Sequence, residues 1–267
     1  MRASTPRFRG GQGQPLLLVH AAMLNWWLWT PLLPLLTGVR DVLAPTLPGH
    51  LGGPTLSRPS PPYIKPFVDF LEAELDAAGF GRVDVVGNSL GGWCALELAR
   101  RGRARSVVAI APVGMHTGQQ GLRWVSQFDR ARDLARRTQW ISALAMASPG
   151  VRRKALALLT ADGGRLPAAL ARELVHSVAA CDLPDFFAAA LASGAQVPMI
   201  EAAEEIDVPV LVIWANGDRL VSGDQIDRYL AALPNAQSVE LDGLGHCPQL
   251  EDPQRVAAEV LRFSRSG

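Results

Sequence analysis

One short segment of the sequence combines the residue types that a nucleophilic site needs. Ser89 stands between Gly87 and Gly91 in GNSLGG, where the β-branched run VDVV stops and a helical pattern begins. We expect a turn so tight that side chains at both glycine positions would collide, with Ser89 held in a strained conformation and its hydroxyl exposed. The segment predicts a serine nucleophile between a strand and a helix.

Two residues far along the chain could activate that serine. A serine hydroxyl is a poor nucleophile at neutral pH, so it needs a base within hydrogen-bond reach and a group that fixes the tautomer of the base. Asp218 follows the apolar run VPVLVIWA, and His246 lies in GLGHCPQLEDP, after the last apolar run. We therefore predict a triad of Ser89 as nucleophile, His246 as general base and Asp218 as the residue that orients His246.

Three separate motifs, GNSLGG, ANGDRLV and GLGHCPQLEDP, together resemble the α/β-hydrolase superfamily, most closely its small esterase, lactonase and perhydrolase branch. The resemblance runs from about Pro15 to the C-terminus and is interrupted only by a variable cap. It implies the α/β-hydrolase fold: a mostly parallel central sheet flanked by helices, with a helical cap insertion. The chain order Ser, Asp, His is also the order of this fold.

The resemblance further implies an oxyanion hole, the pair of N–H donors that binds negative charge during acyl transfer. The expected donors are the backbone N–H groups of Ala22 and Leu90, each worth on the order of a hundredfold in rate. Ala22 follows His20-Ala21, where the family has His-Gly, so Ala21 departs from the family pattern. We expect His20 itself to be structural.

The other histidines outside the predicted triad are also expected to be structural. TLPGHLGG resembles the Asp-Leu-Pro-Gly-His-Gly turn of the family, with Thr46 in the aspartate position and His50 as scaffolding. His116 and His176 lie in the predicted cap, and their spacing to other possible ligands suggests no metal site. We expect core or surface roles for both, and neither a metal nor a cofactor.

Short apolar runs alternate with longer helical patterns, which is typical of a mostly parallel sheet covered by helices on both faces. The expected strands are 16–19, 39–44, 83–86, 107–111, 210–214 and 238–241. The Pro-rich segment RPSPPYIKP is expected to enter a helix at about Pro66. Few residues precede His20, so the leading edge of the sheet should be short.

Strand patterns vanish between about residues 116 and 205, where alanine, leucine and arginine recur at helical spacing. We predict a helical cap over residues 115–205, inserted between two parts of the core at 1–114 and 206–267. Breaks between the cap helices are expected at prolines and glycines, namely Pro149, Pro167, Pro184, Pro198, Gly150, Gly163 and Gly194.

Aromatic residues near the site could bind an apolar substrate. Trp26 belongs to a tryptophan cluster just after the expected oxyanion segment, and the predicted cap carries further aromatic residues at helical spacing. Such residues more often pack a core. The tentative substrate-binding set is Trp26, Trp124, Phe128, Trp140 and Phe186.

Composition limits the other classes of function. The net charge is +1, with 26 basic against 25 acidic residues, so no global field favours nucleic acid or an anionic membrane. The 3 cysteines are widely spaced and predict neither a disulfide framework nor a zinc site, and the polar N-terminus does not resemble a signal peptide. We expect a cytoplasmic protein without a membrane anchor, a monomer or homodimer, whose partner is a small-molecule ester-like substrate.

The predicted triad favours hydrolysis of small, largely apolar carboxylic esters through an acyl-enzyme. The same machinery serves lactone opening, thioester hydrolysis, carbon–carbon bond hydrolysis and perhydrolysis, and the cap and pocket choose among them. An inward cap arginine such as Arg123 would instead favour a substrate carboxylate. Epoxide hydrolases and dehalogenases of this fold use an aspartate nucleophile, so Ser89 disfavours both. A non-catalytic ligand-binding member is the alternative of a different class, although such members commonly lose part of the triad.

Overall fold

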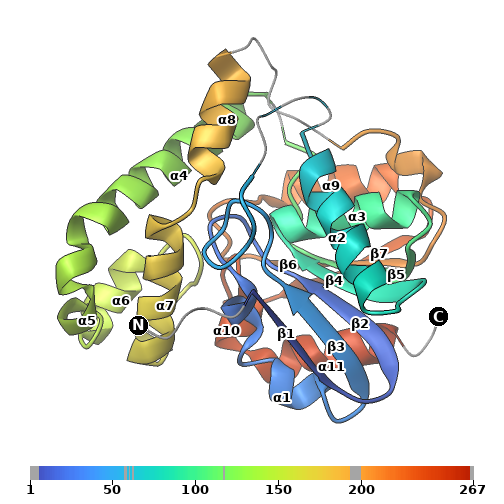
Figure 1. Ribbon diagram of the computed structural model, residues 1–267, viewed down its shortest axis with the longest axis horizontal. Coiled ribbons are helices and arrows are strands. Elements are labelled where there is room, and N and C mark those ends of the chain that lie inside the picture. Colours follow the sequence, from blue (N-terminus) through green and yellow to red (C-terminus); the bar gives the residue numbers. More distant parts are fainter. Residues whose placement is uncertain are drawn as a thin grey trace.

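The computed structural model describes residues 6–56, 59, 61, 63–116, 118–192 and 200–264. A seven-stranded sheet runs through it in the order β1-β3-β2-β4-β5-β6-β7 (Figure 1). β1 is antiparallel to β3, and every other neighbouring pair is parallel. The strands are β1 (Arg7–Gly11), β2 (Gln14–Val19), β3 (Arg40–Pro45), β4 (Val83–Asn88), β5 (Ala104–Ile110), β6 (Val210–Ala215) and β7 (Ala236–Leu241).

Alternate residues of the central strands enter two separate cores, because successive side chains of a strand point to opposite faces. Leu17 and Val19 of β2 pack with α2 (Lys65–Ala77), α3 (Leu90–Arg100) and α9 (Gly223–Ala232). Leu16 and Leu18 pack on the other face with α1 (Leu33–Leu36), the 3₁₀ helix η1 (Trp26–Trp29) and α11 (Pro253–Phe263). The run LLLV is continuous in sequence because both faces of the sheet are covered.

The sheet confirms the predicted fold class, and each expected strand overlaps an observed one. The helix expected at about Pro66 is α2, which begins at Lys65. The sequence pattern does not predict β1, because RFRGG is charged and glycine-rich. Its place comes from pairing along β3, with Arg7 opposite Pro45 and Gly11 opposite Asp41.

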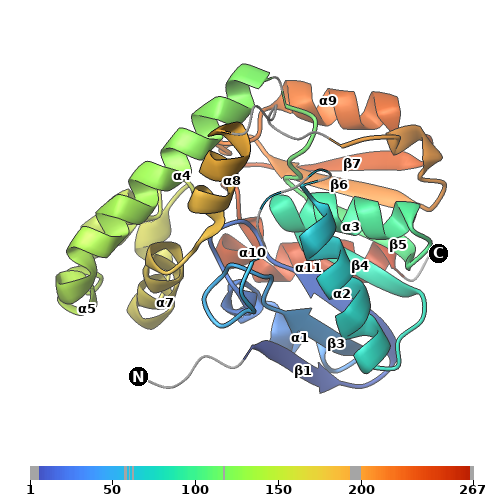
Figure 2. The same cartoon turned by 45° about the horizontal axis from the view of Figure 1, so that its top comes forward.

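A group of helices separates β5 from β6 in the chain. Figures 1 and 2 show α4, α7 and α8 together beside the sheet, next to the loops that follow the parallel strands. Residues 117 and 193–199 lie outside the described part, and with them the breaks expected at Gly194 and Pro198. The helices of this stretch are α4 (Gly118–Thr138), η2 (Gln139–Ile141), α5 (Ser142–Ala145), α6 (Pro149–Ala155), η3 (Gly163–Arg165), α7 (Ala168–Ala179) and α8 (Leu183–Ala192).

The predicted breaks within the described part coincide with helix ends. Pro149 is the first residue of α6, Pro167 caps α7, and Pro184 lies in the first turn of α8. Arg132 of α4 is nearly buried and donates a hydrogen bond of 2.6 Å to Asp185 of α8, which joins these two helices.

One stretch, Ala168–Ala192, is long and apolar enough by length and composition to cross a membrane, with a mean hydropathy of 1.4. It contains α7 and α8, which are separated by the turn around Cys181. Nearly half of this stretch, 44%, is buried within the protein, as in a helix that packs on a core.

Candidate active site

Ser89 occupies the turn between β4 and α3 in a backbone conformation that few side chains adopt, with φ 56° and ψ −114°. A Cβ at Gly87 would overlap the carbonyl group of Gly91, and a Cβ at Gly91 would overlap the carbonyl oxygen of Val19. Both glycines are therefore required by close backbone contacts, as the motif predicts. Strain of this kind persists only where the surrounding structure imposes it.

Hydrogen bonds to β5 and to the segment after it hold this turn in place. The Ser89 N–H donates to the carbonyl of Ile110 at 2.9 Å, and the Ser89 carbonyl accepts from Gly92 at 2.9 Å and from Val113 at 3.3 Å. The backbone around Ser89 is thus bonded on both sides, which offsets the unfavourable φ.

Asp218 and His246 lie together, although the sequence separates them by a helix and a strand. The Nδ1 atom of His246 is 2.8 Å from Oδ2 of Asp218. Oδ1 of Asp218 accepts from the N–H groups of Leu220 at 2.7 Å and Val221 at 3.1 Å. The side chains of His246 and Asp218 are 2% and 1% exposed, so this pair lies in a medium of low polarity. A carboxylate at Nδ1 makes that atom the donor and leaves Nε2 free to accept a proton.

The loop that carries His246 is anchored by polar residues that the sequence reasoning did not identify. Asn88, directly before the nucleophile, donates through Nδ2 to the His246 carbonyl at 3.1 Å and accepts through Oδ1 from Gln249 at 3.0 Å. Glu251 accepts from the Gly245 N–H at 2.7 Å and, in the cap, from Ala161 at 3.1 Å. All three anchoring residues lie inside the quoted motifs, where a polar residue next to a catalytic one is the available signal.

Ser89 and His246 line the same cavity. Within the described residues, no hydrogen bond joins their side chains. Ser89 is 3% exposed, so its hydroxyl, expected to be exposed, faces enclosed space beneath the cap helices instead of bulk solvent. A loose contact between nucleophile and base is common before substrate binds.

The two predicted oxyanion donors lie next to the nucleophile. Ala22 and Leu90 line a cavity together with Ser89. In the described part of the chain, neither of their backbone N–H groups donates to another protein group. Leu90 is also the first residue of α3, whose amino-terminal end carries partial positive charge.

His20 and His50 act as scaffolding for this edge of the site. His20 lies 2.8 Å from the Ala21 carbonyl through Nδ1 and accepts from the Leu47 N–H at 2.9 Å through Nε2, which ties the segment after β2 to the turn after β3. The two imidazoles meet edge to face at 4.9 Å. Burial lowers the pKa of His20 well below its usual range, and burial lowers the pKa of His50 to about 4.

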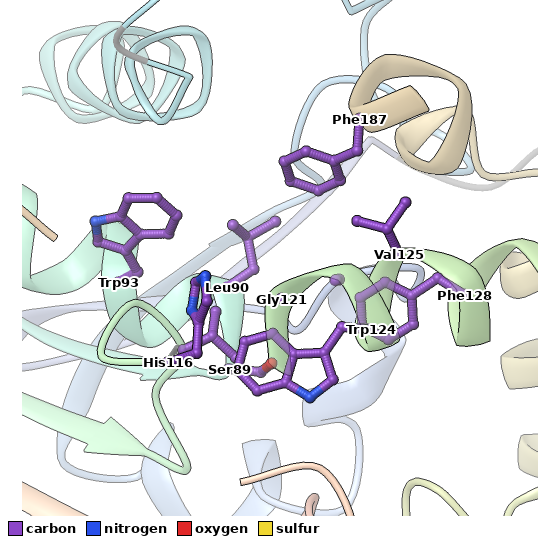
Figure 3. A pocket seen from close by; sticks show the side chains of 11 residues that line it. Ser89, Leu90, Trp93, His116, Gly121, Trp124, Val125, Phe128 and Phe187 are labelled. Atoms are coloured by element: carbon purple, nitrogen blue, oxygen red, sulfur yellow. The ribbon is translucent and has the colours of Figure 1, made fainter. Parts of the chain in front are cut away.

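Two cavities of very different size meet at Ser89. The larger has a volume of about 730 Å³ and runs between α4, α5, α6 and α7 of the cap and the segment after β2. The smaller has a volume of about 50 Å³ and lies among Trp93, Val113, His116, Trp124 and Phe187. Figure 3 shows Ser89, His116 and Trp124 in the lower part of the smaller cavity and Phe187 above them.

The structure divides the tentative substrate-binding residues. Trp124 and Phe128 line the smaller cavity, and Phe128 lines the larger one as well. Trp26 instead packs in the core with the ring of Phe8 at 5.8 Å, and lines neither cavity.

Two further residues of that set are corrected by their surroundings. Trp140 is 84% exposed on η2. Phe186 packs edge to face against Phe67 at 6.0 Å, and its neighbour Phe187 faces the cavity in its place. Helical spacing placed the aromatic pair on a helix but could not say which ring points inward.

Charged and titratable groups around the cavities differ from the expectation in two respects. Arg123 is exposed and lines neither cavity, whereas Arg130 and Lys154 line the larger one. Cys247 lies beside His246, and burial raises the pKa of its thiol, which disfavours a cysteine nucleophile. Among the described residues, no group of His, Cys, Asp and Glu side chains could hold a metal ion.

A model of the alpha/beta hydrolase family matches residues 16–259, a range that contains Ser89, Asp218 and His246. The chain belongs to the alpha/beta hydrolase family. This hydrolase is 31% identical over 199 residues to the epoxide hydrolase EphH of Mycobacterium tuberculosis, across 73% of its own chain and 92% of the relative.

The hydrolase is also similar to proteins with other named substrates. It is 28% identical over 258 residues to a pimeloyl-(acyl-carrier protein) methyl ester esterase of Aromatoleum aromaticum, across 92% of its own chain and 96% of the relative. Among solved structures, the 2-hydroxy-6-oxo-6-phenylhexa-2,4-dienoate hydrolase of Rhodococcus sp. strain RHA1 superposes with a TM-score of 0.77 at 19% identity, covering 97% of this chain and 94% of that one. At that identity the structural likeness supports the fold alone.

Proposed function

We propose that this hydrolase cleaves small, largely apolar carboxylic esters through a triad of Ser89, His246 and Asp218. The observation that carries the proposal is the buried pair of Asp218 and His246 on the cavity that also contains the strained Ser89. This arrangement supplies a nucleophile, a base with a free Nε2, and a carboxylate that stabilises the imidazolium.

The proposed reaction has two half reactions. His246 takes the proton of Ser89 as the hydroxyl oxygen bonds to the ester carbonyl carbon, and the negative oxygen of the tetrahedral intermediate accepts from Ala22 and Leu90. As the carbon–oxygen bond to the alcohol breaks, His246 gives its proton to the departing alkoxide. Water, deprotonated by His246, then attacks the acyl-enzyme, and the acid leaves as Ser89 regains its proton.

Ester hydrolysis is favoured over the epoxide opening named for one relative. Attack of Ser89 on an epoxide carbon would leave an alkyl ether on the serine. An ether has no carbonyl for water to attack, so the enzyme would stop after one turnover. An acyl-serine keeps a carbonyl and can be hydrolysed. Lactones, thioesters and carbon–carbon substrates that pass through an acyl-serine remain alternatives that the same residues would serve.

The larger cavity supports a largely apolar substrate. Its walls are mostly aliphatic, with Met146, Leu156 and Val178 among them, and its polar members Arg130 and Lys154 are exposed residues of the cap. Burial of a hydrocarbon group there would contribute roughly 0.8 kcal/mol per methylene. No cofactor takes part in the proposed reaction.

We also propose the division of the chain into a core of residues 1–114 and 206–267 and a cap of residues 115–205. This division is supported by the position of the helices between β5 and β6. A cytoplasmic location is proposed too, supported by three free cysteines that are all buried.

A fluorophosphonate probe tests the proposed function directly. The wild-type protein should be labelled at Ser89, because a triad and an oxyanion hole together activate the hydroxyl toward electrophilic phosphorus. Ser89→Ala should abolish labelling, while the control Ser126→Ala, on the exposed side of α4, should leave it unchanged. A folded wild-type protein that resists the probe would favour the non-catalytic binding alternative.

A further inference from the structure

His116 is a buried histidine without a partner. It is 3% exposed, and neither Nδ1 nor Nε2 has a hydrogen bond in the described structure. Its ring packs edge to face on Trp124 with centroids 4.7 Å apart. Leaving buried polar atoms unpaired is costly, so most such atoms in folded proteins have partners. A phenylalanine would pack equally well here at no such cost.

The unpaired ring lies on the smaller cavity beside Ser89. His116, Trp124 and Trp93 form one side of this cavity, with Phe187 of the cap across from them (Figure 3). The imidazole thus presents hydrogen-bonding atoms to an otherwise mostly apolar space that adjoins the proposed nucleophile. A substrate group in this space is the missing partner that the geometry offers.

His116 is neutral at physiological pH. Burial, with the charge of Arg228 as the second cause, lowers its pKa to about 4. A neutral imidazole has one N–H donor and one lone pair. This set matches a hydroxyl, which both donates and accepts, or a carbonyl oxygen, which accepts. A carboxylate would find a single donor and would have to be buried in an apolar site.

The position of His246 indicates which part of an ester enters this space. His246 must give its proton to the departing alkoxide, and it lines the larger cavity but not the smaller one. The alcohol part therefore occupies the larger cavity, and the acyl part the smaller. A volume of about 50 Å³ holds about three to five water-sized groups, which is the size of a short acyl chain.

We propose that His116 is a specificity-determining residue that binds an uncharged oxygen substituent, a hydroxyl or a carbonyl, on a short acyl group. The inference rests on the proposed ester hydrolysis and adds to it the chemistry of the acyl part. The preferred substrate class is a short hydroxyacyl or oxoacyl ester of a larger apolar alcohol.

Matched esters test this inference. Hexyl butyrate and hexyl 3-hydroxybutyrate differ by one oxygen on the acyl side, and the wild-type enzyme should hydrolyse the hydroxy ester with a kcat/KM about tenfold higher. In His116→Phe this preference should vanish, with hexyl butyrate turned over within about threefold of the wild-type rate. His116→Gln, which keeps a donor and an acceptor, should recover part of the preference.

Three further measurements separate the possible failures. Fluorophosphonate labelling of Ser89 in wild type and His116→Phe reports the triad independently of His116, so loss of labelling in the wild type would refute the proposed function itself. Labelling with equal kcat/KM for the two esters would overturn only the role of His116, and this comparison needs no variant. A preference that appears with 3-hydroxyhexyl butyrate instead, or for a terminal carboxylate on the acyl group, would overturn it as well.

Discussion

Replacement of Asp218 by asparagine perturbs the proposed triad at one atom while keeping its shape. Oδ1 of Asp218 already accepts from the N–H groups of Leu220 and Val221. An asparagine must place its carbonyl oxygen there, which turns its NH₂ group toward Nδ1 of His246. Nδ1 then has to accept, so the ring carries its proton on Nε2.

The expected loss of activity follows from that change of tautomer. A histidine protonated at Nε2 cannot take the proton of Ser89, and it no longer has a carboxylate to stabilise its positive charge. Loss of the orienting carboxylate in a serine triad costs about ten-thousandfold in kcat. At 1.36 kcal/mol for each tenfold, this is roughly 5.4 kcal/mol of transition-state stabilisation. The folded structure should persist, because both acceptor bonds at Oδ1 are kept.

The assay compares kcat for an activated short-chain ester in Asp218→Asn and Asp224→Asn, with the melting temperature of each variant as a folding control. Asp224 is an exposed residue at the start of α9 whose ion pair with Arg228 is 3.0 Å long, so its variant should lose less than about twofold. Equal losses in the two variants, or a loss under tenfold in Asp218→Asn with a normal melting temperature, would refute the assigned role of Asp218.

Three other outcomes are expected. Gly91→Ala should lower the melting temperature sharply or prevent folding, because its Cβ would overlap the Val19 carbonyl oxygen, whereas Gly81→Ala, with no atom within 4 Å of the new Cβ, should be tolerated; similar melting temperatures would contradict this. The free energy of unfolding should fall as the pH drops below about 6.5, since the pKa of buried His50 is lowered to about 4 and the unfolded chain binds a proton that the folded chain does not. Urea unfolding at pH 7 and 5 should show about 2 kcal/mol less of this loss in His50→Gln, and an unchanged pH dependence would count against it. For alkyl butyrates, kcat/KM should rise about fourfold per added methylene of the alcohol until the 730 Å³ cavity is filled, and a flat series would exclude the apolar cavity as the alcohol site.

The local motifs could be predicted because short-range geometry dictates their residues. The turn around Ser89 needs glycine on both sides, and an apolar run of β-branched residues before it is buried on both faces of a parallel sheet. β1 escaped prediction for the opposite reason: RFRGG has no strand pattern of its own and is held by β3. The anchoring bonds of Asn88 and Glu251 join segments far apart in the chain, so sequence spacing could not reveal them.

The sequence by itself therefore determined the fold class, the serine at its turn, and the aspartate and histidine that follow two strands, since each depends on residues that are neighbours in the chain. The tertiary structure alone decided the surroundings of Ser89. It moved Trp26, Trp140 and Phe186 away from the cavities and brought His116 to the smaller one. Helical periodicity tells which residues share a face of a cap helix, but the surface against which that face docks depends on packing with the rest of the molecule.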